Sequence, residues 1–342
     1  MDNKIDLSKY KVRTDLVMEL VDSNNKNIVE EKIDDITITT VNVEKEISKE
    51  IDKKEGIYIT ISFDDVTNFE TREKIEKILE KQIKKLLKKL AIKEEYECLV
   101  IGLGNIKSTP DSLGPLTIQN IVVTRHLFTL NTEVKEGIRK VSAIAPGVMG
   151  TTGIETLDTI KSIVNTIKPD FIITIDSLSA LSIDRVNKTI QMTDTGIHPG
   201  SGIGNHRKEI SKDTLNIPVI AIGVPTVVEV ATIVNDTINY LFKHLSYIKN
   251  NMEKSKLTFT KLDNYKEKIK NHNLSNEEKK EVIGMIGLLE ENDKKALILE
   301  VLDSINYNLM VTPKEIDFII EKLSDVISSA INNAIHRQIT HY

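Results

Sequence analysis

Cys98-Leu-Val-Ile-Gly-Leu-Gly104 is a short apolar run followed by turn residues, a pattern typical of a buried β-strand. The chain leaves it through Ser108-Thr-Pro and reaches Asp111. A second apolar run, Phe171-Ile-Ile-Thr-Ile-Asp176, stops directly at an aspartate. Chemistry in α/β sheets gathers just beyond the carboxyl ends of the strands. We therefore expect both carboxylates at one edge of one sheet.

Strand-like and helix-like segments alternate around these two runs. We expect strands at residues 98–103, 141–144, 171–175 and 218–222, and helices at 115–129, 153–168 and 225–243. This alternation is typical of crossover connections and predicts an α/β fold, with a mixed, largely parallel sheet and helices on both faces. Residues 36–41 and 57–63 alternate like half-exposed strands, which we expect at the periphery, and 71–90 has the apolar spacing of a helix.

The length of 342 residues is enough for one large α/β domain or two ordinary ones. We expect a single domain with its core at about 98–243. The stretch 244–280 is rich in Lys, Asn and Glu and has no clear apolar period, which predicts a mobile insertion. Helical spacing returns toward the end, so we expect C-terminal helices within 281–342.

The composition favours a cytoplasmic protein. There are 46 Lys and Arg against 51 Asp and Glu, a formal net charge of -5, so we expect neither nucleic acid nor a membrane as partner. The N-terminus lacks the apolar segment of a signal peptide, and no run approaches the roughly 18 apolar residues of a membrane span. Cys98 is the one cysteine, which excludes an intramolecular disulfide and a multi-cysteine metal site.

Familiar cofactor and nucleophile motifs are absent. Lys107 stands where a dinucleotide fingerprint beginning at Gly102 needs its third glycine. The phosphate-binding P-loop, His-Glu-x-x-His and Gly-x-Ser-x-Gly patterns do not occur. We therefore expect no cofactor and assign no metal.

Asp111 and Asp176 allow two interpretations. Each suits the N-cap of a helix, a role compatible with catalysis because a helix N-terminus lowers the pKa of a carboxylate. A pair of carboxyls also suits peptide hydrolysis, since one group must take a proton from water and another must give one to the leaving amine. Two carboxyls about 3 Å apart do not both ionise easily, and so supply one base and one acid. At a larger separation a bridging metal ion is the competing mechanism, with His198 as a third ligand.

A glycine-rich loop within 193–209 is the third candidate feature. Its four glycines at 196–204 let the backbone approach a ligand or offer N–H groups to an oxyanion. His198 is either a solvated histidine or a polarising or metal-binding imidazole. The basic residues around Arg207 are either a solvated face or an attractor of acidic peptide. The substrate-binding or oxyanion candidates are His198, Gly200, Ser201, Gly202 and Arg207.

At these residues the chain closely resembles the germination protease family, peptidase family A25, of spore-forming Gram-positive bacteria. The resemblance is weakest at 22–95 and 244–275. Where the family usually has Asn-Lys-Arg-Lys-Glu, this chain has Asn205-His-Arg-Lys-Glu209. The matching stretches are 98–105, 109–115, 124–127, 146–150, 152–155, 194–202 and 308–315.

The resemblance implies an endopeptidase of small acid-soluble spore proteins, which acts when germination begins. It implies a homotetrameric zymogen in the spore core that matures by self-cleavage. The fold would be phosphorylase/hydrolase-like and related to the hydrogenase maturation proteases. The catalytic aspartates of the family fall on Asp111 and Asp176. The family has been labelled both a metallopeptidase and an acid-type peptidase, so no metal site is firmly implied.

The N-terminus resembles the family's substrates, which are cut after an acidic residue. Thr14-Asp-Leu-Val-Met-Glu-Leu20 has their outline, so by analogy residues 1–15 are a propeptide, cut between Asp15 and Leu16, and the peptidase domain is 16–342. An accessible terminal segment suits a protease, although a frayed terminus with an accidental match is the alternative. Two rival functions are a metal-dependent maturation-type peptidase using Asp111, Asp176 and His198, and a non-catalytic spore-protein-binding protein.

Overall fold

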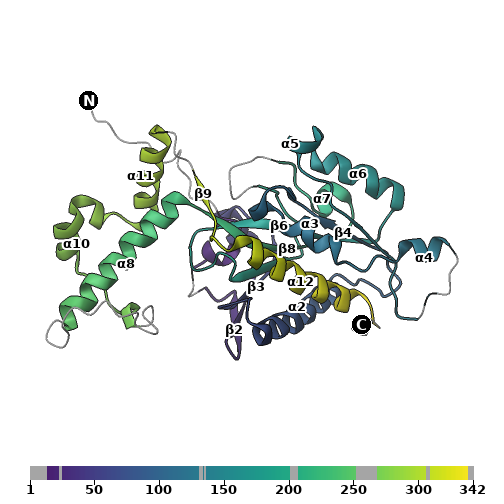
Figure 1. Ribbon diagram of the computed structural model, residues 1–342, viewed down its shortest axis with the longest axis horizontal. Coiled ribbons are helices and arrows are strands. Elements are labelled where there is room, and N and C mark those ends of the chain that lie inside the picture. The colour runs from purple at the N-terminus through teal and green to yellow at the C-terminus, as the bar shows by residue number, and fades with distance from the viewer. Residues whose placement is uncertain are drawn as a thin grey trace. The chain divides into compact units, whose positions relative to one another are not determined.

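The computed structural model describes residues 14–22, 25–130, 134, 136–200, 207–251, 268–305 and 309–337. They form two compact units (Figure 1). The larger, which we call the sheet unit, takes its described residues from 13–180, 184–227 and 312–342. The smaller, the helical unit, takes them from 181–183 and 228–311.

One mixed sheet joins the strands of the described residues in the order β1-β2-β3-β7-β8-β6-β4-β5, with β9 pairing β8. β4 pairs in parallel with both β5 and β6, whereas β1, β2, β3, β7 and β8 follow one another antiparallel. The strands are β1 (Ile28–Ile33), β2 (Ile36–Val43), β3 (Gly56–Ser62), β4 (Cys98–Gly102), β5 (Val141–Ile144), β6 (Phe171–Ala180), β7 (Thr189–Thr193), β8 (Val219–Glu229) and β9 (Met310–Val311).

The mixed α/β fold is confirmed, but the parallel part is smaller than expected. The N-terminal strands lie at one end of the sheet, as expected, and they continue it, because β7 pairs with β3 on one side and with β8 on the other. This strand therefore joins the N-terminal hairpins to the central sheet. No strand is predicted from the sequence at β7 or β1, and the antiparallel half of the sheet that these two strands help to build was therefore not expected.

Helices cover both faces of the sheet, as predicted (Figure 1). Side chains alternate along β4, so that Cys98 and Val100 pack into the core cluster of α2 and α12. Leu99 and Ile101 point the other way, into the cluster of α6. The helices of the sheet unit are α1 (Lys45–Ile51), α2 (Phe69–Lys89), α3 (Leu113–Gln119), α4 (Arg125–Thr129), α5 (Met149–Thr152), α6 (Thr156–Ile167), α7 (Lys212–Leu215) and α12 (Ile316–Ile335), with short 3₁₀ turns η2 (Val17–Glu19) and η3 (Thr109–Asp111).

Two expected helices have different bounds. The helix expected at 115–129 is broken into α3 and α4, and between them the Thr124 N–H donates to the Val141 carbonyl of β5 and so does not continue a helix. The helix expected from 225 begins at Val230, since the preceding residues continue β8.

The helical unit contains α8 (Val230–Asn251), α10 (Asn276–Ile283), the turn η5 (Gly284–Leu288) and α11 (Glu291–Ser304). Asn235 and Asn239 of α8 donate to the Glu291 carboxylate and thereby tie α8 to α11. The insertion expected from residue 244 therefore begins inside a helix, and its stretch 252–267 lies outside the described residues.

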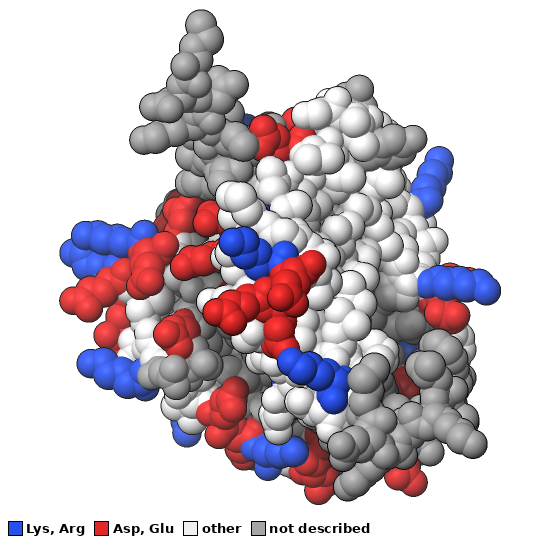
Figure 2. Space-filling view, turned by 90° about the vertical axis from the view of Figure 1, so that its left-hand side faces the viewer, with Lys and Arg blue, Asp and Glu red and all other residues white. Residues whose placement is uncertain are grey.

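Figure 2 shows a face on which acidic and basic side chains are interspersed and a broad area carries neither. This mixture agrees with the near balance of charges in the sequence.

Among the described helices, none is both long and apolar enough to span a bilayer.

Candidate active site

Asp111 closes a tight loop that follows β4. The Asn105 N–H donates to both the main-chain oxygen and Oδ2 of Asp111, at 2.9 Å each. Gly104 permits this closure, because its φ is +113° and a Cβ there would lie 2.1 Å from the Asp111 main-chain oxygen. The local sequence thus fixes this carboxyl group just beyond the carboxyl end of β4.

Asp176 lies inside a strand, not at its end. β6 continues to Ala180, and the Asp176 side chain is only 5% exposed. Its Oδ1 accepts a hydrogen bond of 2.9 Å from the Ser177 N–H. Ser112 is the N-cap of the helix that follows Asp111. The helix-capping interpretation is therefore wrong for both aspartates.

The two carboxyl groups interact electrostatically. Burial raises the pKa of Asp176 well above its ordinary value, and the charges of Asp111 and Asp15 raise it further, against the Ser177 N–H and Arg207. Burial also raises the pKa of Asp111 to about 6, opposed by the Asn105 N–H and Arg207. Asp111 and Asp15 therefore both lie within electrostatic range of Asp176. Asp176 is the more deeply buried of the two, and its pKa is raised both by that burial and by the charge of Asp111.

The raised pKa of Asp111 makes folding stability depend on pH. A carboxyl whose folded pKa of about 6 exceeds its ordinary 3.8 stabilises the fold fully below pH 3.8 and loses that contribution as the pH rises through 6. Asp111→Asn imitates the neutral form. We expect its free energy of unfolding, relative to the unaltered chain, to improve by about 2–3 kcal/mol between pH 4 and pH 8.

Urea unfolding at the two pH values measures this change. The matched control is Asp34→Asn, at an exposed aspartate with a left-handed backbone that Asn tolerates. An equal pH effect in the two variants would contradict the assignment to Asp111.

The glycine-rich loop contributes Arg207 to this region. Arg207 Nη1 is buried and has no hydrogen-bond partner among the described residues, while its charge lowers the pKa of both Asp111 and Asp176. His198 is elsewhere engaged, with Nε2 at 3.1 Å from Glu209 Oε2. Gly200 has a left-handed φ of +74°, and Ser201 and Gly202 lie outside the described residues.

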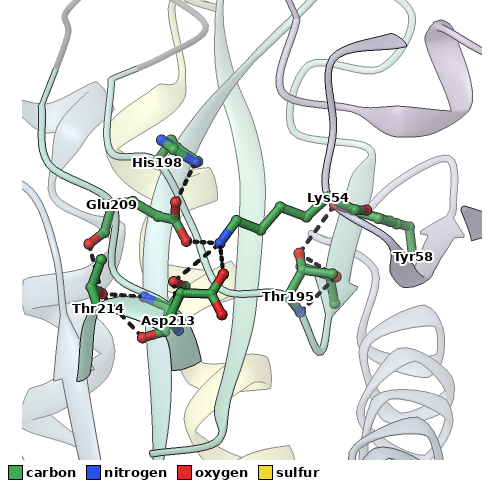
Figure 3. Close-up of polar contacts among 9 residues, drawn as sticks. Lys54, Tyr58, Thr195, His198, Glu209, Asp213 and Thr214 are labelled. Carbon is green, nitrogen blue, oxygen red and sulfur yellow. Dashed lines mark hydrogen bonds and ion pairs between the residues drawn. The ribbon is translucent and has the colours of Figure 1, made fainter. Parts of the chain in front are cut away.

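Lys54 fastens this loop to the N-terminal part of the sheet unit (Figure 3). Its ammonium group contacts the carboxylates of Glu209 and Asp213. The Tyr58 hydroxyl donates to the Lys54 carbonyl at 3.0 Å and accepts from Thr195 Oγ1 at 3.1 Å. The Lys54 ammonium thus binds two carboxylates that follow the glycines of the loop, while its carbonyl is linked through Tyr58 to Thr195, which precedes them.

A metal site would need ligands that converge. No group of three His, Cys, Asp or Glu side chains gathers in a metal-binding arrangement within the described ranges. His198 Nε2 contacts Glu209, which the metal hypothesis did not include. Of the three ligands in that hypothesis, Asp111 and Asp176 interact electrostatically, whereas His198 contacts Glu209.

The segment predicted to be cut runs beside β6. The Asp15 N–H donates to the Ser179 carbonyl at 3.1 Å, and the Ser179 N–H donates to Asp15 Oδ2 at 2.9 Å. Lys53 Nζ donates to the Thr14 carbonyl at 3.1 Å. Leu16 is fully buried. The Asp15–Leu16 bond is thus held on the strand that carries Asp176; residues 1–13 of the expected propeptide lie outside the described residues.

A cavity of about 460 Å³ opens beside Asp15. Its lining includes Gln191 of β7 and Lys54, neither of which is among the candidate site residues predicted from the sequence. The signal for β7 was present, because Ile190 and Met192 alternate with polar residues, but the run is short. Other lining residues are Tyr58, Leu178, Thr193, His198 and Gly223.

Known proteins resemble the chain over nearly its full length. A sequence model of germination proteases matches residues 9–342. A germination protease from Geobacillus sp. is 47% identical, with 99% of this chain and 97% of the relative aligned. Another from Bacillus mycoides is 46% identical over the same shares. Among solved structures, a NiFe hydrogenase maturation protease from Thermococcus kodakarensis is 17% identical, with a TM-score of 0.26 over 39% of this chain and 75% of that one.

The family match covers the loop of Asp111, the strand of Asp176 and the segment at Asp15 alike. The relatives align over almost all of their own length as well. The chain therefore belongs to the germination protease family, and it is a protease.

Proposed function

We propose that this protease is an endopeptidase that begins the degradation of small acid-soluble spore proteins at germination. It is made as a zymogen and removes residues 1–15 by cutting its own Asp15–Leu16 bond. It works in the spore core as a homotetramer. Family membership supports the substrate, the location and the assembly. The observation that carries self-cleavage is the Asp15 segment, which is hydrogen-bonded to β6 within electrostatic range of Asp176.

Asp111 and Asp176 divide the proton transfers of hydrolysis. Ionised Asp111 takes a proton from water, whose oxygen bonds to the Asp15 carbonyl carbon. The C–N bond then breaks, and Asp176 gives its proton to the Leu16 nitrogen. The raised pKa of Asp176 supports its role as the acid, and the pKa of about 6 supports Asp111 as the base.

Arg207 suits the charge that develops on the carbonyl oxygen. A buried guanidinium nitrogen with no hydrogen-bond partner in the described residues is available to an oxyanion at little cost in reorganisation. Its positive charge also favours ionisation of Asp111, so it supports the base as well.

Incubation of the purified full chain tests the proposal. We expect sequencing of the matured protein to begin at Leu16, and we expect a small acid-soluble spore protein to be cut after an acidic residue. A different first residue would overturn the assignment of the cut. An uncut spore protein would instead favour a binding role.

A chelator arm tests the mechanism. Dialysis against EDTA is expected to leave the cleavage rate unchanged, because the carboxyl pair itself carries both protons. Loss of activity that returns on adding a divalent metal would favour the metal-dependent mechanism.

A further inference from the structure

Gln191 is a buried amide in the middle of β7. It pairs with Thr60 of β3 and with Gly223 of β8, and its side chain is 6% exposed. Ile190 and Met192, its neighbours along the strand, belong to the hydrophobic core on the opposite face. A buried primary amide must find hydrogen-bond partners, and this one finds them outside the sheet.

The partners of Gln191 lie on both sides of one peptide bond. Its Nε2 donates to the Asp15 carbonyl at 2.9 Å, and its Oε1 accepts from the Val17 N–H at 2.8 Å. A side-chain amide has the same donor and acceptor as a peptide group, so it pairs with residues i and i+2 of an extended segment as a neighbouring strand would. The bond between Asp15 and Leu16 lies between these two contacts.

We propose that Gln191 is a substrate-binding residue that clamps the backbone across the bond to be cut, in the chain's own segment and in its protein substrates. This inference rests on the proposed function. The amide N–H holds the carbonyl that water attacks, and the amide oxygen holds the N–H two residues on.

The clamp would recognise the main chain more than the side chains of a peptide. Gln191, Lys53 and the Ser179 carbonyl contact main-chain atoms that every peptide has. The Ser179 N–H donates to the Asp15 carboxylate and so reads an acidic side chain before the cut. Backbone recognition thus supplies the position of the bond, and this side-chain contact contributes to the preference.

An ester substrate isolates the proposed contact. We compare a peptide of residues 10–20 with the same peptide carrying an ester in place of the Val17 N–H, and we follow cleavage after Asp15 by mass spectrometry. Gln191→Leu loses both hydrogen bonds, and we expect its kcat/KM for the amide peptide to fall about 10- to 100-fold. The unaltered chain is expected to lose about 3- to 10-fold on the ester, and Gln191→Leu less than about 2-fold.

Thr189→Val is the matched control. Thr189 lies on the same strand and face, is buried, and its hydroxyl donates to the Arg185 carbonyl and not to the main chain at Asp15 or Val17. We expect Thr189→Val to keep the ester penalty of the unaltered chain. If β7 had only a structural role, substitutions at Thr189 and at Gln191 would affect the ester penalty alike. An equal ester penalty in the unaltered chain and in Gln191→Leu would overturn the clamp.

Failure of the proposed function gives a separate result. If the unaltered chain cuts neither peptide, that function fails, and fluorescence anisotropy then compares binding of the two labelled peptides. An ester penalty confined to chains with Gln191 supports the clamp, and the same penalty in every variant overturns it.

Discussion

Asp176→Asn is expected to lower kcat for peptide cleavage by about 10²- to 10⁴-fold, the usual contribution of a positioned acid or base. Asn has the shape of a protonated Asp but has no proton to give to the leaving amine. Because Asp176 is buried inside β6 and burial raises its pKa, the neutral Asn replaces a carboxyl group that favours its neutral form, so the fold should not suffer. Asp111→Asn is expected to cost a similar factor, since an amide does not accept the proton of water.

Steady-state cleavage of a peptide of residues 10–20 measures both losses. The two residues act as one unit, so the double variant should be scarcely slower than either single one. Asp34→Asn, at an exposed aspartate paired with Lys74, is expected to keep full activity. Retention of more than about a tenth of the activity in either site variant would remove that residue from the proton transfers.

Gly104→Ala is expected to abolish most activity and to lower the free energy of unfolding by about 2–4 kcal/mol. The new Cβ would meet the Asp111 main-chain oxygen at 2.1 Å, and alanine also disfavours the φ of +113°. The loop must open to accommodate the methyl group, and this opening breaks the hydrogen bonds from Asn105 that hold Asp111.

Gly150→Ala is the matched control for this prediction. A Cβ at Gly150 would have no atom within 4 Å, so neither stability nor activity should change much. Thermal unfolding and peptide cleavage are measured together for both variants. A Gly104→Ala chain as stable and active as the Gly150→Ala chain would show that the loop does not set the position of Asp111.

The sequence was informative where local pattern decides structure. The apolar runs at 98–104 and 171–176 are buried strands of one sheet, and they pair in parallel, as their spacing predicts. The nearness of Asp111 and Asp176 follows from that pairing. Their catalytic role stays a prediction, because the residues alone do not show which group gives or takes a proton.

The parts of the site that escaped prediction depend on distant contacts. β6 was expected to stop at Asp176, because a carboxyl group rarely lies within a buried strand. It continues because the residues that follow still alternate, and because Asp15 pairs with Ser179 across a long sequence separation. Gln191 was not predicted for a related reason. Its proposed role depends on hydrogen bonds to two main-chain groups that are distant in sequence, and its sequence neighbours give no sign of them.

The two aspartates differ in how their main chains are held. Asp176 belongs to a strand in the interior of the sheet, whose amides open only when much of the sheet unit opens. Asp111 belongs to a loop that a few hydrogen bonds and one glycine keep closed. Local opening will therefore separate the pair by moving Asp111 while Asp176 stays in place. Under the proposed mechanism, warming or mild denaturant would therefore first displace the base, Asp111, while the acid, Asp176, stays in place.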